Sequence, residues 1–193
     1  MHKFSNCVIA YHGCDRKTQE YVITGGAFKK SKNAYDWLGN GIYFWENDEQ
    51  RALEWAKDLK KRGKISDPAV VGAIIDMGNC LDLTQRESVE LLKVGYELLL
   101  LRSELSGIRI PKNHTINKFG DILERDLDCA VIEQIHEWTE KEDLEKYDTV
   151  RGVFTEGGEV YPGASFVNKT HIQICVVNPN TIIGCFLPRA NSR

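Results

Sequence analysis

The order of the apolar segments constrains the fold of this chain more than any other feature. Short runs rich in Val, Ile and aromatic residues, which are typical of buried strands, occur near both ends, and the longest helical patterns lie between them. This order is not a regular alternation of strands and helices, so we predict an α+β domain. The strand-like runs are 6–12, 41–45 and 69–76 in the first half, and 150–155, 170–177 and 181–188 in the second.

Four helices are predicted beside and between these strands. One covers about Arg16–Ile23, and a second opens at Asn47, which with Gln50 three residues later has the pattern of a capping box. A third runs over about Thr84–Leu105. The fourth is marked by an apolar face of Leu127, Val131, Ile135 and Trp138, and a loop with Pro111, Asn113 and Gly120, long enough to be functional or mobile, precedes it.

The length and charge of the chain narrow its class. Its 193 residues suit a single domain over 1–193 with a helical insertion at about 84–148. A net charge of −3 gives no overall basic field for nucleic acid, and we interpret the basic run at 57–64 as the solvated end of a helix. There is neither a Walker motif nor a G-x-G-x-x-G motif, which argues against a P-loop or Rossmann site.

The cysteines and the N-terminus bear on compartment and metal binding. No pair of the six cysteines has C-x-x-C spacing, and several lie in apolar runs, so we expect small buried thiols in a reduced cytoplasm and no metal site. The N-terminal stretch "MHKFSNCVIAYHG" has no long apolar run. We therefore expect neither an export signal nor a membrane span.

Three residues stand out as candidates for chemistry. His12 ends the first strand beside Gly13, where it either meets a ligand or bonds locally. Tyr43 follows the turn "GNG", where it either stacks on a flat ligand or fills the core. Gln173 lies midway along an apolar strand, where its amide is costly to bury unless it binds a ligand or a neighbouring loop.

The order of these motifs resembles a known family. "YHG" ends the first strand, "GNGIYF" comes about thirty residues later before a helix containing "ALEWA", and "VVGAIIDMGN" and "THIQICVVNPNTIIGCF" follow. This order resembles the ADP-ribosyltransferase fold, in its diphtheria-toxin and poly(ADP-ribose) polymerase branch. The resemblance covers about 7–60, 69–83 and 150–188, whereas the middle helices have no counterpart. It implies a split β-sheet core with the helical insertion in its middle.

The resemblance also implies roles for individual residues. NAD would be the co-substrate, with no metal. His12 would hydrogen-bond the adenosine-side ribose, and the Gly13 backbone would hold the nicotinamide amide. Tyr43 would stack on the nicotinamide ring and Trp55 would close the stack from the other side, which suits a flat cationic ring.

The chain departs from the family at the position of its catalytic glutamate. Aligning the last two strands places Gln173 there, and a neutral amide can form the hydrogen bond but supplies no charge. Glu156 and Glu159, in the glycine-rich stretch "TEGGEVYPGAS", either take over this role on a mobile lid or belong to a plain exposed turn. Cys14 stands where the family often has a small hydroxyl residue, which leaves one amide contact open.

The resemblance implies a mono-ADP-ribosyltransferase that cleaves NAD, releases nicotinamide and passes ADP-ribose to an acceptor. The acceptor would be a protein, a nucleic acid or a small molecule, and a role as a bacterial toxin or defence effector follows by analogy alone. Two alternatives stay open. Water would be the acceptor in an NAD glycohydrolase, and Gln173 would suit a module that binds NAD or ADP-ribose without turnover.

Overall fold

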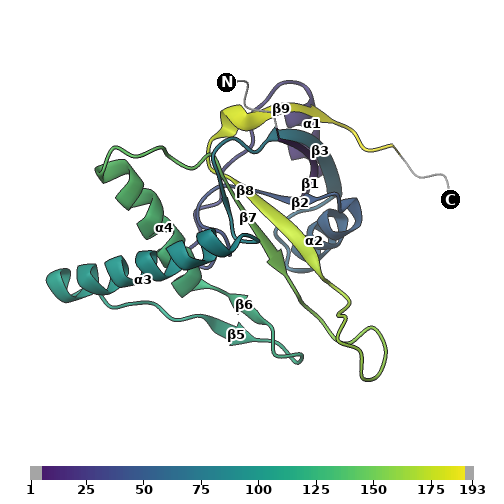
Figure 1. The fold of residues 1–193 in the computed structure, drawn as a ribbon. Helices are drawn as coiled ribbons and strands as arrows, with labels where there is room; N and C mark the ends of the chain where they lie inside the picture. The colour runs from purple at the N-terminus through teal and green to yellow at the C-terminus, as the bar shows by residue number, and fades with distance from the viewer. Residues whose placement is uncertain (1–5, 190–193) are drawn as a thin grey trace.

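The computed structural model describes residues 6–189 and has an α+β fold built on one large mixed sheet (Figure 1). Seven strands follow the order β4-β7-β8-β2-β1-β3-β9, in which β4 and β7 are parallel and the other neighbours antiparallel. The α+β prediction is therefore confirmed. The elements are β1 (Cys7–Asp15), α1 (Arg16–Ile23), β2 (Ile42–Glu46), α2 (Glu49–Lys61), β3 (Pro68–Asp76), β4 (Cys80–Asp82), α3 (Arg86–Ser106), β5 (His114–Ile116), β6 (Ile122–Glu124), α4 (Asp126–Lys141), β7 (Thr149–Phe154), β8 (His171–Val176) and β9 (Ile182–Phe186).

The sheet is weakly joined at its centre. β1 and β3 pair along the whole of β1, from Cys7 to Asp15, whereas β1 and β2 pair at two positions, Ala10 with Glu46 and Tyr11 with Trp45. Beyond Tyr11 the two strands have no further pairing. The sheet thus consists of two parts, β1-β3-β9 and β4-β7-β8-β2, which separate at His12.

Helices lie on both faces of the sheet. On one face, Ala10 of β1, Phe44 of β2 and Ile174 of β8 belong to a single buried cluster, and α1 packs at the β1 and β3 end of that face. On the other face, α2 covers β1 and β3, while α3 and α4 pack together over β4, β7 and β8. Figure 1 shows α3 and α4 extending away from α2.

The middle segment shares the core of the domain. The two helices expected there are present, and Ile132 and Ile135 of α4 are buried against β4 and β7. The connection expected as a loop also contains a short antiparallel ribbon, β5 with β6. Each ribbon strand has three residues, too few for an alternating pattern to indicate a strand. The same shortness explains why β4 was not predicted.

The start of α2 differs from the prediction by one residue. Its N-cap is Asp48, whose Oδ1 accepts a hydrogen bond from Arg51 N at 2.9 Å, so the expected Asn47–Gln50 capping box is wrong. Asn47 instead adopts a left-handed backbone with φ of 51° and turns the chain out of β2. Asparagine tolerates this conformation better than most residues, which is why it precedes the true cap.

Asp48→Ala is expected to lower the free energy of unfolding by about 1 kcal/mol, because an N–H at the start of α2 loses its acceptor. Urea unfolding followed by circular dichroism measures the change. Asn47→Gly is the matched control, since glycine adopts positive φ freely, and its effect should be about half as large or less. A larger loss for Asn47→Gly than for Asp48→Ala would contradict this assignment of the cap.

Two further expectations concern membrane spans and the cysteines. No helix in the described range 6–189 is long and apolar enough to cross a membrane; residues 1–5, on which part of the expectation about the N-terminus rests, lie outside this range. No disulfide joins any of the six cysteines, all of which lie in the described range. Cys14, Cys129 and Cys175 are buried as expected, but Cys7 is exposed because it lies at the outer end of β1.

Candidate functional site

A histidine connects the two parts of the sheet at the point where they separate. His12 Nδ1 lies 2.7 Å from the backbone carbonyl of Tyr43, across the part of β1 and β2 where strand pairing has stopped. A carbonyl oxygen can only accept, so Nδ1 carries the ring proton and donates it. Nε2 is then left as the acceptor of the ring. The split therefore contains a hydrogen-bond acceptor held in a fixed tautomer.

The surroundings of His12 keep it neutral. Its ring packs against Phe28 at a centroid distance of 5.0 Å and against Phe44 at 5.6 Å. Burial lowers the pKa of His12, and the hydrogen bond to the Tyr43 carbonyl opposes that shift more weakly. A neutral imidazole with a free acceptor nitrogen suits a hydroxyl donor, such as one on a ribose.

Tyr43 is held by the glycine turn that precedes it. Its hydroxyl donates to the Gly39 carbonyl at 2.7 Å and accepts from Leu38 N at 2.8 Å. Hydrogen bonds also connect this turn to α4. The Glu133 carboxylate accepts one from Asn40 N at 2.7 Å and one from the Asn40 side-chain amide at 2.5 Å. Burial raises the pKa of Tyr43, so the hydroxyl stays protonated. The helical insertion thus helps to position this tyrosine.

Alternation along β2 places the two candidates on opposite faces. Ile42 and Phe44 lie in the core cluster on the His12 face. Tyr43 packs on the other face, where its register partner on β8 is Cys175. His12 and Tyr43 are therefore linked through the Tyr43 backbone, and a ligand that touches both side chains has to enter the split between β1 and β2.

Four polar side chains meet on the Tyr43 face, and we call them the β8 polar cluster: Arg51, Glu156, His171 and Gln173. The Gln173 amide nitrogen lies 3.0 Å from His171 Nε2, and the Glu156 carboxylate lies 3.9 Å from the same nitrogen and 3.3 Å from Arg51. Gln173, His171 and Glu156 are all buried. The cluster joins β8, the β7–β8 connection and α2, and Gln173 pairs with Trp45 of β2.

The two loop carboxylates differ in their position relative to the cluster. Glu156 lies beside His171 and so belongs to the surroundings of Gln173. Burial raises the pKa of Glu156, while Arg51 opposes the shift. Glu159 does not join the cluster, because its exposed carboxylate accepts from Gly163 N at 2.8 Å and holds a turn. Of the two loop carboxylates, Glu156 is the one near the site.

Two buried donors, one in the cluster and one next to it, have no partner among the described residues. They are Trp45 Nε1 and Arg51 Nε, and the Arg51 guanidinium lies 5.9 Å from the centre of the Trp45 ring. A buried unpaired N–H is costly, so these two atoms are suited to an acceptor that the chain itself does not supply. A carboxamide oxygen or a hydroxyl has that chemistry.

The remaining candidates occupy less direct positions. The ring centres of Trp55 and Trp45 lie 6.1 Å apart, and the Arg62 guanidinium contacts the Trp55 ring. Within the described chain the Trp55 ring has no contact with the Tyr43 ring. An aromatic sandwich of Tyr43 and Trp55 would therefore need a ligand between the two rings. A Cβ at Gly13 would lie 2.0 Å from the Ala52 carbonyl, so this glycine lets α2 approach β1. Cys14 is buried, and burial raises its pKa to about 11.

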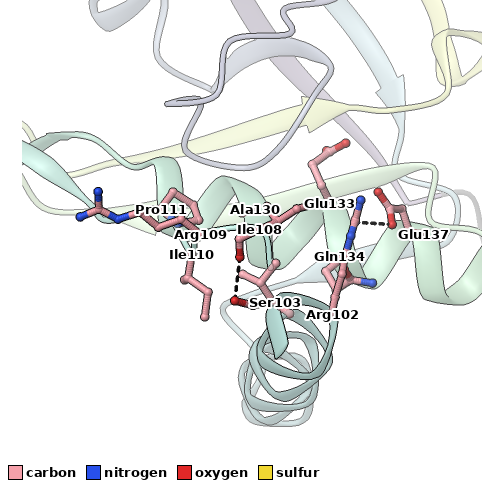
Figure 2. Close-up of a pocket in the computed structure, with 11 residues that line it drawn as sticks. Arg102, Ser103, Ile108, Arg109, Ile110, Pro111, Ala130, Glu133, Gln134 and Glu137 are labelled. Carbon is pink, nitrogen blue, oxygen red and sulfur yellow. Dashed lines mark hydrogen bonds and ion pairs between the residues drawn. The ribbon is translucent and has the colours of Figure 1, made fainter. Parts of the chain in front are cut away.

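A cavity of about 240 Å³ lies between α3, residues 108–111 and α4 (Figure 2). Its walls are tied by an Arg102–Glu137 ion pair of 2.7 Å and by Ser103 Oγ, which donates to the Ile108 carbonyl at 2.7 Å. Glu133, which holds the turn before Tyr43, also lines this cavity.

A larger cavity of about 620 Å³ lies between α3, α4 and the Trp37 and Phe154 side chains. The Arg125 guanidinium lies 4.2 Å from the Trp37 ring centre and 5.0 Å from that of Phe154, and Trp37 in turn stacks on His171 at 6.5 Å. This cavity therefore adjoins the β8 polar cluster through one indole. Neither cavity is lined by His12 or Gln173.

Sequence reasoning missed three residues of the site. Arg51 and Glu133 act through partners distant in sequence, and no local pattern marks them. A signal for His171 existed, because it precedes Gln173 by two residues and so lies on the same face of β8.

The chain is 27% identical, over 193 aligned residues, to the uncharacterized protein MJ0359 of Methanocaldococcus jannaschii. The alignment covers 89% of this chain and 83% of that protein. No family model matches the chain, and no solved structure matches it. The chain is thus similar to an archaeal protein over most of both lengths, and its function is inferred from the site described above.

Proposed function

We propose that this protein is an ADP-ribosyltransferase that binds NAD in the split between β1 and β2 and transfers ADP-ribose to an acceptor. The observation that carries the proposal is the His12 imidazole, which reaches 2.7 Å to the Tyr43 carbonyl where pairing of the two strands stops. The two residues expected from the motifs "YHG" and "GIYF" thereby meet at the split, although 31 positions separate them in the chain.

The chemistry of the surrounding groups supports a ligand that carries ribose hydroxyls and a planar ring. His12 offers Nε2 as an acceptor for a ribose hydroxyl, and Tyr43 offers an aromatic ring beside the split. The unpaired N–H groups of Trp45 and Arg51 suit a carboxamide oxygen or a hydroxyl. Gln173 would contact the second ribose, and Glu156 would supply the negative charge that an oxocarbenium-like transition state needs.

Binding of NAD or ADP-ribose without turnover is the second candidate. Gln173 is neutral, its amide nitrogen is occupied by His171, and the Glu156 carboxylate is paired with Arg51. A site with these features can recognise the ligand and yet stabilise little developing charge. Hydrolysis of NAD, with water as the acceptor, belongs to the same chemistry as the first candidate.

The wild-type protein, incubated with NAD, is expected to release nicotinamide, and His12→Ala is expected to weaken NAD binding about tenfold or more. The physical reason is the loss of a hydrogen bond that the ribose hydroxyl then leaves unmade. Nicotinamide release is followed by chromatography and NAD binding by calorimetry. His114→Ala, at an exposed histidine of β5, is the matched control and should retain wild-type affinity.

The products separate the candidates. Labelled ADP-ribose on a macromolecule identifies a transferase, and free ADP-ribose identifies a glycohydrolase. Binding without nicotinamide release identifies a binding module. Absence of NAD binding by the folded wild type, or equal affinity in His12→Ala, would refute the assignment of this split as the NAD site.

A further inference from the structure

The geometry points to His171 as a positioning residue that orients the Gln173 amide, so that its carbonyl oxygen and not its NH₂ group is presented to the ligand. This inference rests on the proposed function, in which Gln173 meets the ribose of NAD. It adds a part for a residue that no motif marks. A carboxylate has two equivalent oxygens and would need no such orientation. An oriented amide can present its oxygen to the ligand in the same way.

The hydrogen bonds of the histidine ring fix its tautomer. His171 Nδ1 lies 2.7 Å from the backbone carbonyl of Lys169, which can only accept. The proton therefore resides on Nδ1, and Nε2 has a lone pair and no hydrogen. The group 3.0 Å from Nε2 must then be a donor, which in Gln173 is the amide nitrogen.

The amide has two unlike ends, so fixing one fixes the other. With the nitrogen of Gln173 bound to His171, Oε1 is directed away from the ring. No hydrogen bond to Oε1 occurs within the described chain, so it is left to accept from a ligand. A ribose hydroxyl donates to such an oxygen as it would to a carboxylate oxygen. In the reversed amide an N–H would face the hydroxyl, and the hydroxyl would have to act as the acceptor.

Packing holds the ring in place. The His171 side chain is fully buried, stacks on Trp37 with an interplanar angle of 27°, and lies 5.9 Å from the Phe154 ring. The charged groups that face it come from two segments: Arg51 and Asp48 at the start of α2, and Glu156 and Lys169 in the connection before β8. Burial lowers the pKa of His171 to about 4, so Nε2 remains an acceptor at neutral pH.

The substitution that tests this role is His171→Phe, which retains a ring against Trp37 and Phe154 but removes the acceptor for the Gln173 amide. We expect kcat/KM for NAD to fall about tenfold, because the amide loses its preferred orientation. The same change in a Gln173→Glu background is the matched control. A carboxylate has two equivalent oxygens, so there the loss should be about twofold or less. A loss of equal size in both backgrounds would show that His171 acts on the fold alone.

A measurement on the wild-type protein determines the orientation of the Gln173 amide. It needs no activity assay and does not depend on whether a variant folds. Nitrogen-15 NMR should show His171 as the Nδ1–H tautomer and a scalar coupling between its Nε2 and the Gln173 amide nitrogen. A protonated Nε2 at neutral pH would overturn the inference. If the wild type neither binds nor cleaves NAD, the proposed function and the ribose contact fall together, while the coupling still supports or overturns the orientation by itself.

Discussion

Gly13→Ala is expected to destabilise the domain by about 3 kcal/mol or more. A Cβ at this position would lie 2.0 Å from the Ala52 carbonyl oxygen and 2.9 Å from its carbon. Both atoms belong to the backbone of α2, so no side-chain rotation relieves the overlap and the helix itself must move. Chemical unfolding at equilibrium measures the loss.

Gly184→Ala is the matched control, because it is also a strand glycine and a Cβ there meets no atom within 4 Å. Its free energy of unfolding should change by about 0.5 kcal/mol or less. An equally stable Gly13→Ala protein would show that α2 is not seated on β1 as described. Because α2 also carries Arg51, a shifted but folded variant should lose the contact with Glu156 as well.

This packing gives Gly13 a part that the sequence did not indicate. The motif "YHG" suggested that its backbone holds a nicotinamide amide, and the close approach of α2 is a separate reason for a glycine there. The two reasons make different predictions. A ligand contact alone would leave the stability of Gly13→Ala intact, whereas the packing contact lowers it in the absence of NAD.

The fold was predictable where local pattern and tertiary demand agree. Strong alternation or continuous apolar runs marked β1, β2, β3, β7, β8 and β9, and a 3.6-residue apolar period marked α4. β4 and the β5–β6 ribbon have three residues per strand, and pairing with a distant partner defines them. The cap of α2 was misplaced because both Asn47 and Asp48 are good capping residues, and backbone geometry decided between them.

The site was predictable only in the residues that motifs carry. His12, Tyr43 and Gln173 came from strand ends and from an odd amide in an apolar strand. His171 lies two residues before Gln173 on the same face of β8 and could have been selected. Arg51 could not be selected, because its role depends on a contact with Glu156 across the fold. The same is true of Glu133, whose carboxylate holds the turn before Tyr43 from 93 positions away.

The helical insertion thereby gains a connection to the site. α4 has no counterpart in the family that the motifs resemble, so the sequence alone gives it no role at the site. In the structure, its Glu133 binds the turn that fixes the Tyr43 hydroxyl. The insertion also supplies one wall of the cavity that adjoins Trp37 and, through it, His171. Changes in α4 are therefore expected to reach the β2 and β8 side of the split, where Tyr43 and His171 lie.

Glu156→Gln is expected to lower kcat for nicotinamide release on the order of 10²-fold, with a small effect on stability. If the loop supplies the charge that Gln173 lacks, the isosteric amide retains the shape and removes the charge. Burial already raises the pKa of Glu156, so its ionised form is disfavoured by the site, and neutralising it costs the fold about 1 kcal/mol or less. Arg51 retains Glu54, 3.3 Å away, as a partner.

The pH profile and a neighbouring carboxylate make this test specific. Catalysis by an ionised Glu156 should rise as pH increases through its raised pKa, and Glu156→Gln should lose that rise while the rest of the profile remains. Glu159→Gln is the matched control, because this carboxylate belongs to the same connection but holds a turn outside the β8 polar cluster. Equal losses in the two variants would indicate that the connection matters as a whole. An unchanged rate in Glu156→Gln would exclude the loop as the source of the charge, and the neutral Gln173 would then favour binding without turnover.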